Sequence, residues 1–212
     1  MVADARAHSR EKAWLLRALA VLQSPRAVFA ALRDDSDEDA HARQEPVLAL
    51  VWLAGMAAVL AAPAMNNLMD DPARDAVVVA IIVFFAGGIY GLAAYFLLGG
   101  VLHLSTRAFG SHGSFRRARH LLAFAVAPLG LALVTFWPIR IAVEGRALFT
   151  SGGGDSRDHV FANLFYVFVA WAVVLVFVGV RTIHGWGRGR SFAAVAVATA
   201  IAVLLVLGTA LL

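Results

Sequence analysis

The chain of 212 residues has no cysteine, and only 15% of its residues are charged. The lack of cysteine excludes disulfide bonds, thiolate nucleophiles and sulfur-ligated metal sites. The low charge excludes an ordinary water-soluble domain, in which about 25% of the residues are charged and about 45–50% are apolar. Here 61% of the residues are hydrophobic, and the mean hydropathy is +0.77. The sequence therefore predicts an integral membrane protein.

Five apolar stretches have the length that a membrane-spanning helix needs, roughly 17–25 residues. We predict an all-α fold, a polytopic membrane bundle of five transmembrane helices. These helices are expected at residues 47–65, 76–104, 120–137, 160–180 and 192–212. Residues 1–46 are expected to form a separate cytoplasmic arm, so that the chain divides into this arm and a transmembrane domain at residues 47–212.

The predicted arm has an amphipathic part and an acidic part. An apolar stripe at helical spacing comprises Trp14, Leu15, Ala18, Leu19 and Leu22. Ser24 and Pro25 are typical of the start of a second short helix. Basic amphipathic helices lie along membrane surfaces, so we expect an anchor, with a partner-binding arm as the alternative. The acidic run DDSDED at residues 34–39 is expected to be a solvated linker.

Basic residues are concentrated at one end of the predicted bundle. The loops at residues 105–119 and 181–191 contain no Asp or Glu, and they hold seven arginines: Arg107, Arg116, Arg117, Arg119, Arg181, Arg188 and Arg190. Together with residues 1–46, this side carries fourteen Lys and Arg residues against four on the other side. By the positive-inside rule, the N-terminus lies in the cytoplasm and the C-terminus outside it. We expect this membrane to be a bacterial inner membrane.

The middle of each predicted span contains no Asp, Glu, Lys, Arg or His. Proton relays, ion-coupled carriers and voltage sensors need charge at that depth, so the absence of ionisable side chains argues against these functions. Gly87 and Gly91 have the small-xxx-small spacing that lets helices approach closely, either within the bundle or between two chains. Pro128 is expected to bend the third span, as a fixed feature or as a hinge.

The arginines of the two basic loops are the strongest candidates for a site. An arginine near an anionic leaflet contributes about 1 kcal/mol, so these side chains are expected to contact lipid headgroups or a partner, unless they only set topology. His103, His120 and His184 are weak candidates for a metal site, because the loops offer no carboxylate to complete the ligand set. We predict no metal, no cofactor and no catalysis, since no nucleophile has both a base and an orienting carboxylate.

Four features in order resemble the YIP (Ypt-interacting protein) domain family, of the bacterial type. They are SPRAVFAAL before the first span, GSHGSFR leading into LLAFAVAP, GVRTIHGWGRGRSFAA between the last two spans, and the five spans with a cytoplasmic N-terminus. The resemblance covers residues 24–212 and implies the fold and the topology. Eukaryotic members of the family act in vesicle trafficking and contact prenylated Rab-type GTPases. The chain lacks their long cytoplasmic arm and their D-L-Y-G-P motif, so no binding residues are carried over.

Two functions are left open by the sequence. The leading hypothesis is a non-catalytic membrane protein that organises the membrane or binds lipid or protein partners through its basic cytoplasmic face. Its expected partners are anionic lipid headgroups, and a second copy or another membrane protein, but not nucleic acid. The alternative is a facilitator for a small neutral or lipidic solute. Such a path would be lined by Tyr90, Tyr95, Asn163 and Tyr166.

Overall fold

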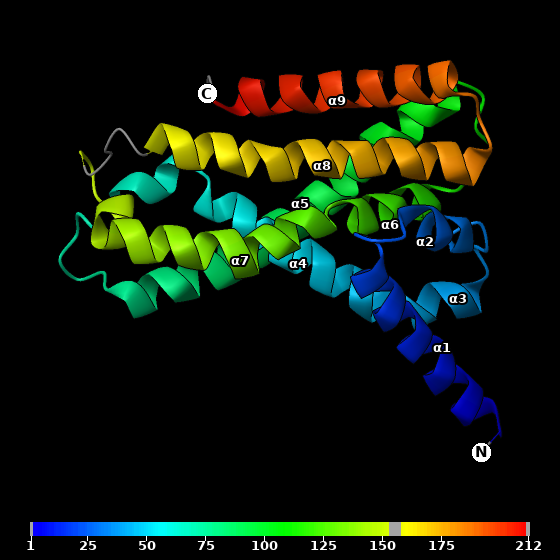
Figure 1. The fold of residues 1–212 in the computed structure, drawn as a ribbon, viewed down its shortest axis with the longest axis horizontal. Coiled ribbons are helices and arrows are strands. Elements are labelled where there is room, and N and C mark those ends of the chain that lie inside the picture. The colour runs from blue at the N-terminus through cyan, green and yellow to red at the C-terminus, as the bar shows by residue number, and fades with distance from the viewer. Residues whose placement is uncertain (1, 153–157, 211–212) are drawn as a thin grey trace.

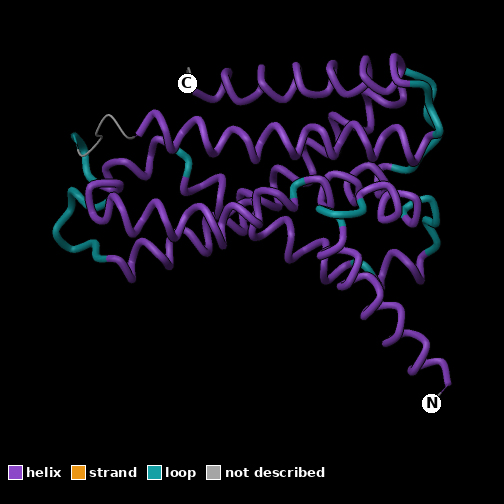
Figure 2. Tube along the Cα trace, viewed as in Figure 1, coloured by secondary structure: helices purple, strands orange, loops and turns teal. Residues whose placement is uncertain are grey.

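The computed structural model describes residues 2–152 and 158–210, and within these residues it contains helices and no strand (Figure 2). The α-helices are α1 Val2–Ala20, α2 Pro25–Ala31, α3 Asp37–Ala42, α4 Gln44–Leu60, α5 Ala76–Ala108, α6 Phe115–Ala125, α7 Ala127–Glu144, α8 Asp158–His184 and α9 Arg188–Ala210. Two short 3-10 helices are η1 Pro63–Asn67 and η2 Gly145–Phe149.

Helices α4 to α9 run back and forth along the long axis of the molecule (Figure 1). The α5–α6 and α8–α9 loops lie at the right-hand end of Figure 1, together with α2 and α3. We call this the basic end. The α4–α5 connection, the end of α7 and the start of α8 lie at the opposite end, where the described part of α9 also finishes.

Four helical segments in the described residues are long and apolar enough to cross a membrane: Ala76–Ala108, Phe115–Phe149, Val160–His184 and Arg188–Leu205. The prediction of an all-α membrane bundle is confirmed. The prediction of five spans exceeds these four, because α4 has only 17 residues, about 25 Å of helix against a bilayer core of about 30 Å. Its predicted range, 47–65, is displaced toward the C-terminus, because the helix runs from Gln44 to Leu60 and Pro63 opens η1.

The third predicted span, 120–137, is two helices. The helix breaks at Val126, two residues before Pro128, which occupies the first turn of α7 and has no N–H to donate. The expected end at residue 137 is wrong, since α7 continues to Glu144 with Pro138 inside it. The neighbouring Trp137 is buried against Phe165 of α8, with ring centroids 5.8 Å apart, and this packing keeps the helix in place.

The other predicted ends shift by a few residues. Helix α5 extends four residues past the predicted 104, where the Ser105 hydroxyl donates to the Ala194 carbonyl of α9 at 2.6 Å. Helix α8 extends from the predicted 180 to His184. Helix α9 begins at Arg188 rather than 192, and residues 211–212 of the predicted fifth span lie outside the described residues.

The N-terminal helices share a core with the basic end of the bundle. Trp14 and Phe29 are fully buried, and the Trp14 ring lies 5.6 Å from the ring of Phe124 on α6. The apolar stripe of α1 is therefore split between two faces. Trp14 points into the protein, whereas Leu15 and Leu19 are exposed, Leu19 to 76%. A second core at the opposite end contains Phe136, Trp137 and Phe165.

Helices α4 and α5 cross at glycines. A Cβ atom on Gly55 would overlap the Gly87 carbonyl oxygen and lie 2.8 Å from the Gly91 Cα. A Cβ atom on Gly91 would overlap the Val51 carbonyl oxygen, and one on Gly87 would lie 2.6 Å from the Met56 Cα. The Gly87–Gly91 spacing thus packs two helices of the same chain, which is the first of the two alternatives.

Candidate functional site

The acidic segment at the basic end is folded. Ser36 caps the N-terminus of α3, where its Oγ accepts from the Asp39 backbone N–H at 3.4 Å. Asp37, Glu38 and Asp39 lie in the first turn, where the helix dipole favours negative charge. The expectation of a solvated linker at residues 34–39 is met only in part, because Asp34, Asp37 and Glu38 are exposed but residues 37–39 form the first turn of α3. Residues 37–39 are helical because Ser36 and these acids suit a helix start.

Arg43 is the centre of a buried polar cluster, with a side-chain exposure of 0%. Its Nη2 donates to Asp35 Oδ1 at 2.9 Å, its Nη1 to the Asp34 carbonyl at 2.9 Å, and its Nε to His120 Nδ1 at 2.6 Å. Burial lowers the pKa of Arg43, and the carboxylates of Asp35 and Asp39 oppose this shift. Because arginine stays protonated, His120 Nδ1 must be the acceptor, and a neutral ring carries its proton on Nε2.

Asp35 connects Arg43 to the basic loop. It accepts from Arg116 Nε at 3.2 Å and from the Ser114 hydroxyl, and Arg117 Nε lies 3.9 Å from its carboxylate. Burial raises the pKa of Asp35, but the bond from Ser114 and the charges of Arg116 and Arg117 outweigh it and hold the pKa below its ordinary value. Asp35 thus supplies the negative charge that the loop at residues 105–119 lacks.

Arg116 also pairs with Asp37, with Nη1 2.6 Å from Oδ1. The bond and the charge of Arg116 lower the pKa of the Asp37 carboxyl. Arg117 Nη2 donates to the Arg33 carbonyl at 3.1 Å. Two of the seven predicted arginines, Arg116 and Arg117, are therefore held by the N-terminal segment.

The remaining predicted arginines have different environments. Arg190 Nε donates to the Phe109 carbonyl at 2.7 Å and the guanidinium lies 4.2 Å from the Trp186 ring, which ties the two basic loops together. Arg119 lies against aromatic rings of α5 and α6. For Arg107, Arg181 and Arg188, the described residues offer no ion pair or hydrogen bond to the guanidinium, and Arg107 and Arg188 are exposed.

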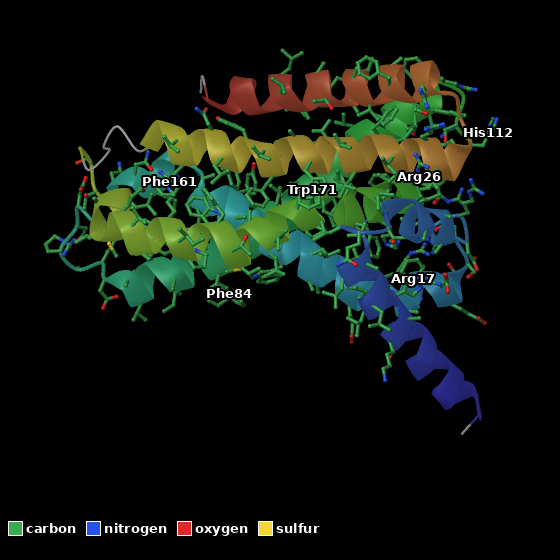
Figure 3. The ribbon with its side chains drawn as sticks, in the orientation of Figure 1. Arg17, Arg26, Phe84, His112, Phe161 and Trp171 are labelled. Carbon is green, nitrogen blue, oxygen red and sulfur yellow. The ribbon has the colours of Figure 1, made fainter. Side chains whose placement is uncertain are left out.

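A cavity of about 350 Å³ lies where α2 meets the end of α8. Three arginines line it, Arg26, Arg33 and Arg181, and Trp186 lines it as well. Arg33 Nε donates to the Thr182 carbonyl at 3.1 Å, which fixes α2 to α8. Figure 3 shows Arg26 and His112 at the basic end and Phe161 at the other end. The arrangement places positive charge beside an apolar wall, as a membrane interface requires.

Of the three histidines proposed as weak metal ligands, His103 and His184 line one small cavity, and His120 lies apart from them. His103 packs on Phe115 with ring centroids 5.8 Å apart, and His120 accepts from Arg43. His184 stacks on Trp186 with centroids 4.6 Å apart. In the part of the chain that the structure describes, no three His, Asp or Glu side chains are grouped closely enough to hold a metal ion.

Ser111 and His184 form the one serine–histidine contact among the described hydrogen bonds, with Oγ and Nδ1 3.4 Å apart. The cavity beside them is about 10 Å³, enough for roughly one water molecule. Ser114 caps α6, where its Oγ accepts from the Arg117 backbone N–H at 3.0 Å. These contacts stabilise the loop and leave no room for a substrate.

A family model for the Yip1 domain matches residues 19–211. The chain belongs to the Yip1 domain family. The resemblance seen in the sequence is confirmed, and membership together with the apolar helices supports a non-catalytic, multi-pass membrane protein. No curated protein and no solved structure gives a significant match to the chain.

The polar residues suggested as a solute path through this Yip1 domain lie apart. Tyr95 is buried, whereas Tyr90, Asn163 and Tyr166 are exposed. Tyr90 and Tyr95 line one cavity of about 160 Å³, but Asn163 and Tyr166 of α8 are not part of its wall. This geometry does not favour the facilitator hypothesis.

The sequence reasoning missed Arg43, Asp35 and the inward position of Trp14. One signal was available. The acid-free loops and the acidic run at residues 34–39 have opposite charge, and both are predicted on the same side of the membrane. This complementary charge predicts ion pairs between the acids of residues 34–39 and the arginines of the loops.

Proposed function

We propose that this Yip1-domain protein is a non-catalytic membrane scaffold whose basic end faces the cytoplasm and binds anionic lipid headgroups. The observation that carries the proposal is a division among the arginines. Arg116 and Arg117 are ion-paired within the protein, whereas Arg107 and Arg188 are exposed without a carboxylate partner among the described residues. The positive-inside rule supports the cytoplasmic orientation.

The physical basis is the attraction between exposed guanidinium groups and an anionic leaflet, about 1 kcal/mol for each group. Arginine forms bidentate bonds to phosphate, so Arg107, Arg181 and Arg188 suit phospholipid headgroups. The exposed Leu15 and Leu19 of α1 give the same end an apolar surface that fits a membrane interface.

Lipid analysis of the purified protein tests this proposal. The protein is extracted in polymer nanodiscs from membranes that contain phosphatidylglycerol, and the anionic fraction of its lipids is compared with that of the whole membrane. We expect enrichment for the wild type and its loss in the triple variant Arg107→Gln, Arg181→Gln and Arg188→Gln. Arg74→Gln, an exposed arginine at the opposite end, is the control.

Two results would contradict the proposal. One is an unchanged anionic fraction in the triple variant. The other is an N-terminal tag that is cleaved by protease added outside intact cells, because the basic end would then face away from the cytoplasm. If a second membrane protein co-purifies in a 1:1 ratio and anionic lipid is not enriched, the basic end binds a protein partner and the lipid proposal is wrong.

A further inference from the structure

A second cavity at the basic end has a polar side and an apolar side. It lies between α4 and α5, is bounded by α3 and α6, and has a volume of about 320 Å³. Its polar wall includes Arg119, His120 and His41, and its apolar wall includes Leu48, Leu92 and Phe96. Leu48 is 44% exposed and Phe96 is 51% exposed on the flank of the bundle. The cavity is therefore bordered by exposed apolar surface.

Arg119 is the positive charge of this cavity that has no anionic partner. Its guanidinium carbon lies 5.1, 4.5 and 4.6 Å from the ring centres of Tyr95, Phe96 and Phe115. Its Nε is buried without a hydrogen-bond acceptor, and no ion pair joins it to a carboxylate among the described residues. Aromatic faces attract a cation but accept no full hydrogen bond. Arg119 therefore has donors available for an anion.

Arg119 differs from the neighbouring Arg43 and Arg116, which both have carboxylate partners. Arg43 donates to Asp35 and Arg116 pairs with both Asp35 and Asp37, so the N-terminal acids are already engaged. Arg119 lies one turn further along α6 than Arg116, toward the membrane interior. A charge at that depth is costly unless it meets a counter-charge.

The apolar cavity lined by Tyr90 and Tyr95 adjoins the cavity that contains Arg119. It has a volume of about 160 Å³, and Val51 and Tyr95 belong to the walls of both. From these residues its wall continues along Gly55 and Gly91 toward the middle of the bundle. Together the two cavities are cationic near the loops and apolar deeper in the membrane, which is the polarity of a phospholipid.

We propose that the cavity of about 320 Å³ between α4 and α5 holds one anionic phospholipid, with its phosphate at Arg119 and an acyl chain along Leu48 and Leu92. This inference rests on the proposed function, because it requires anionic lipid at the basic end. It goes further in naming one stoichiometric site, distinct from headgroups around the exposed loops.

Native mass spectrometry of the protein in mild detergent, titrated with phosphatidylglycerol, tests the site. We expect one tightly held lipid on the wild type and about tenfold weaker retention on Arg119→Gln, because a charge-assisted contact is lost. Leu48→Trp, which fills the cavity and keeps Arg119, is expected to lose the lipid as well. Arg74→Gln, which removes one exposed positive charge at the opposite end, is the control and is expected to keep the lipid.

Folding is checked separately by thermal unfolding of each variant. If Arg119→Gln does not fold, Leu48→Trp alone decides the question. Retention of one lipid by Leu48→Trp overturns the site. Inorganic phosphate that stabilises the protein as strongly as phosphatidylglycerol, through Arg119, also overturns it, because the ligand would then be a free anion.

The two proposals fail differently. If Arg119→Gln and Leu48→Trp keep the bound lipid while the triple loop variant loses its anionic enrichment, the site is wrong and the proposed function stands. If all of these variants keep wild-type lipid in both measurements, both are wrong. Loss of the single lipid in the cavity variants, with bulk enrichment unchanged, supports the site.

Discussion

The basic end and the α4–α5 crossing hold helices together by opposite means. At the basic end, Arg43 and Asp35 join segments far apart in the sequence through charge and hydrogen bonds. At the crossing, Gly55 and Gly91 join helices by having no side chain at all. The difference follows the depth in the membrane. Buried ion pairs are tolerated near the membrane surface, where charged partners and water are close. Deeper in the bilayer, close packing of helix backbones takes their place.

Removal of the Arg43 side chain is expected to have the largest effect. Arg43→Ala leaves His120 and the Asp34 carbonyl without their buried donor, while Asp35 keeps Arg116 and Ser114. We therefore expect a loss of about 3 kcal/mol, the lower end of the cost of breaking a buried pair. Thermal unfolding in detergent measures the loss. Arg107→Ala, which removes an exposed arginine at the same end, should leave the unfolding temperature unchanged. Equal shifts for both variants would show that the cluster does not stabilise the fold.

A methyl group at the crossing is expected to have a smaller effect. Gly55→Ala forces the new Cβ onto the backbone of α5, and overpacking of this kind costs about 1–3 kcal/mol. The same measurement applies, with Gly100→Ala as the control, because a Cβ there would lie 3.7 Å from the Phe115 ring, an ordinary contact. A Gly55→Ala variant as stable as Gly100→Ala would contradict the close crossing.

Acid is expected to have the smallest effect, which we measure at Asp35 of the basic end. The pKa of Asp35 is lower in the folded protein than its ordinary value of 3.8. Its contribution to stability is therefore fully present above about pH 3.8 and is lost as the pH falls through the folded pKa. Unfolding temperatures from pH 7 to pH 3 should converge for the wild type and Asp35→Asn. A constant difference between them would exclude this carboxylate as the titrating group.

The basic end and the α4–α5 crossing also differ in how much of their structure the sequence predicts. Apolar length and positive charge predicted the membrane bundle and its loops, because these features depend on local composition. The ion pairs of Arg43 with residues 34–39 depend on how the N-terminal helices fold back onto α6, which local composition does not determine. The glycine crossing was predicted only as one of two alternatives, because Gly87 and Gly91 specify close approach and not the partner helix.

Lipid enrichment in variants of equal charge tests the central claim most directly. Arg117→Gln and Arg188→Gln each remove one positive charge from the basic end, but Arg117 lies beside Asp35 and Arg188 is exposed without a partner among the described residues. We predict that Arg188→Gln lowers the anionic lipid fraction in polymer nanodiscs and that Arg117→Gln leaves it unchanged. Equal reductions in both would contradict the account, because net charge rather than the pairing of individual arginines would then govern lipid binding.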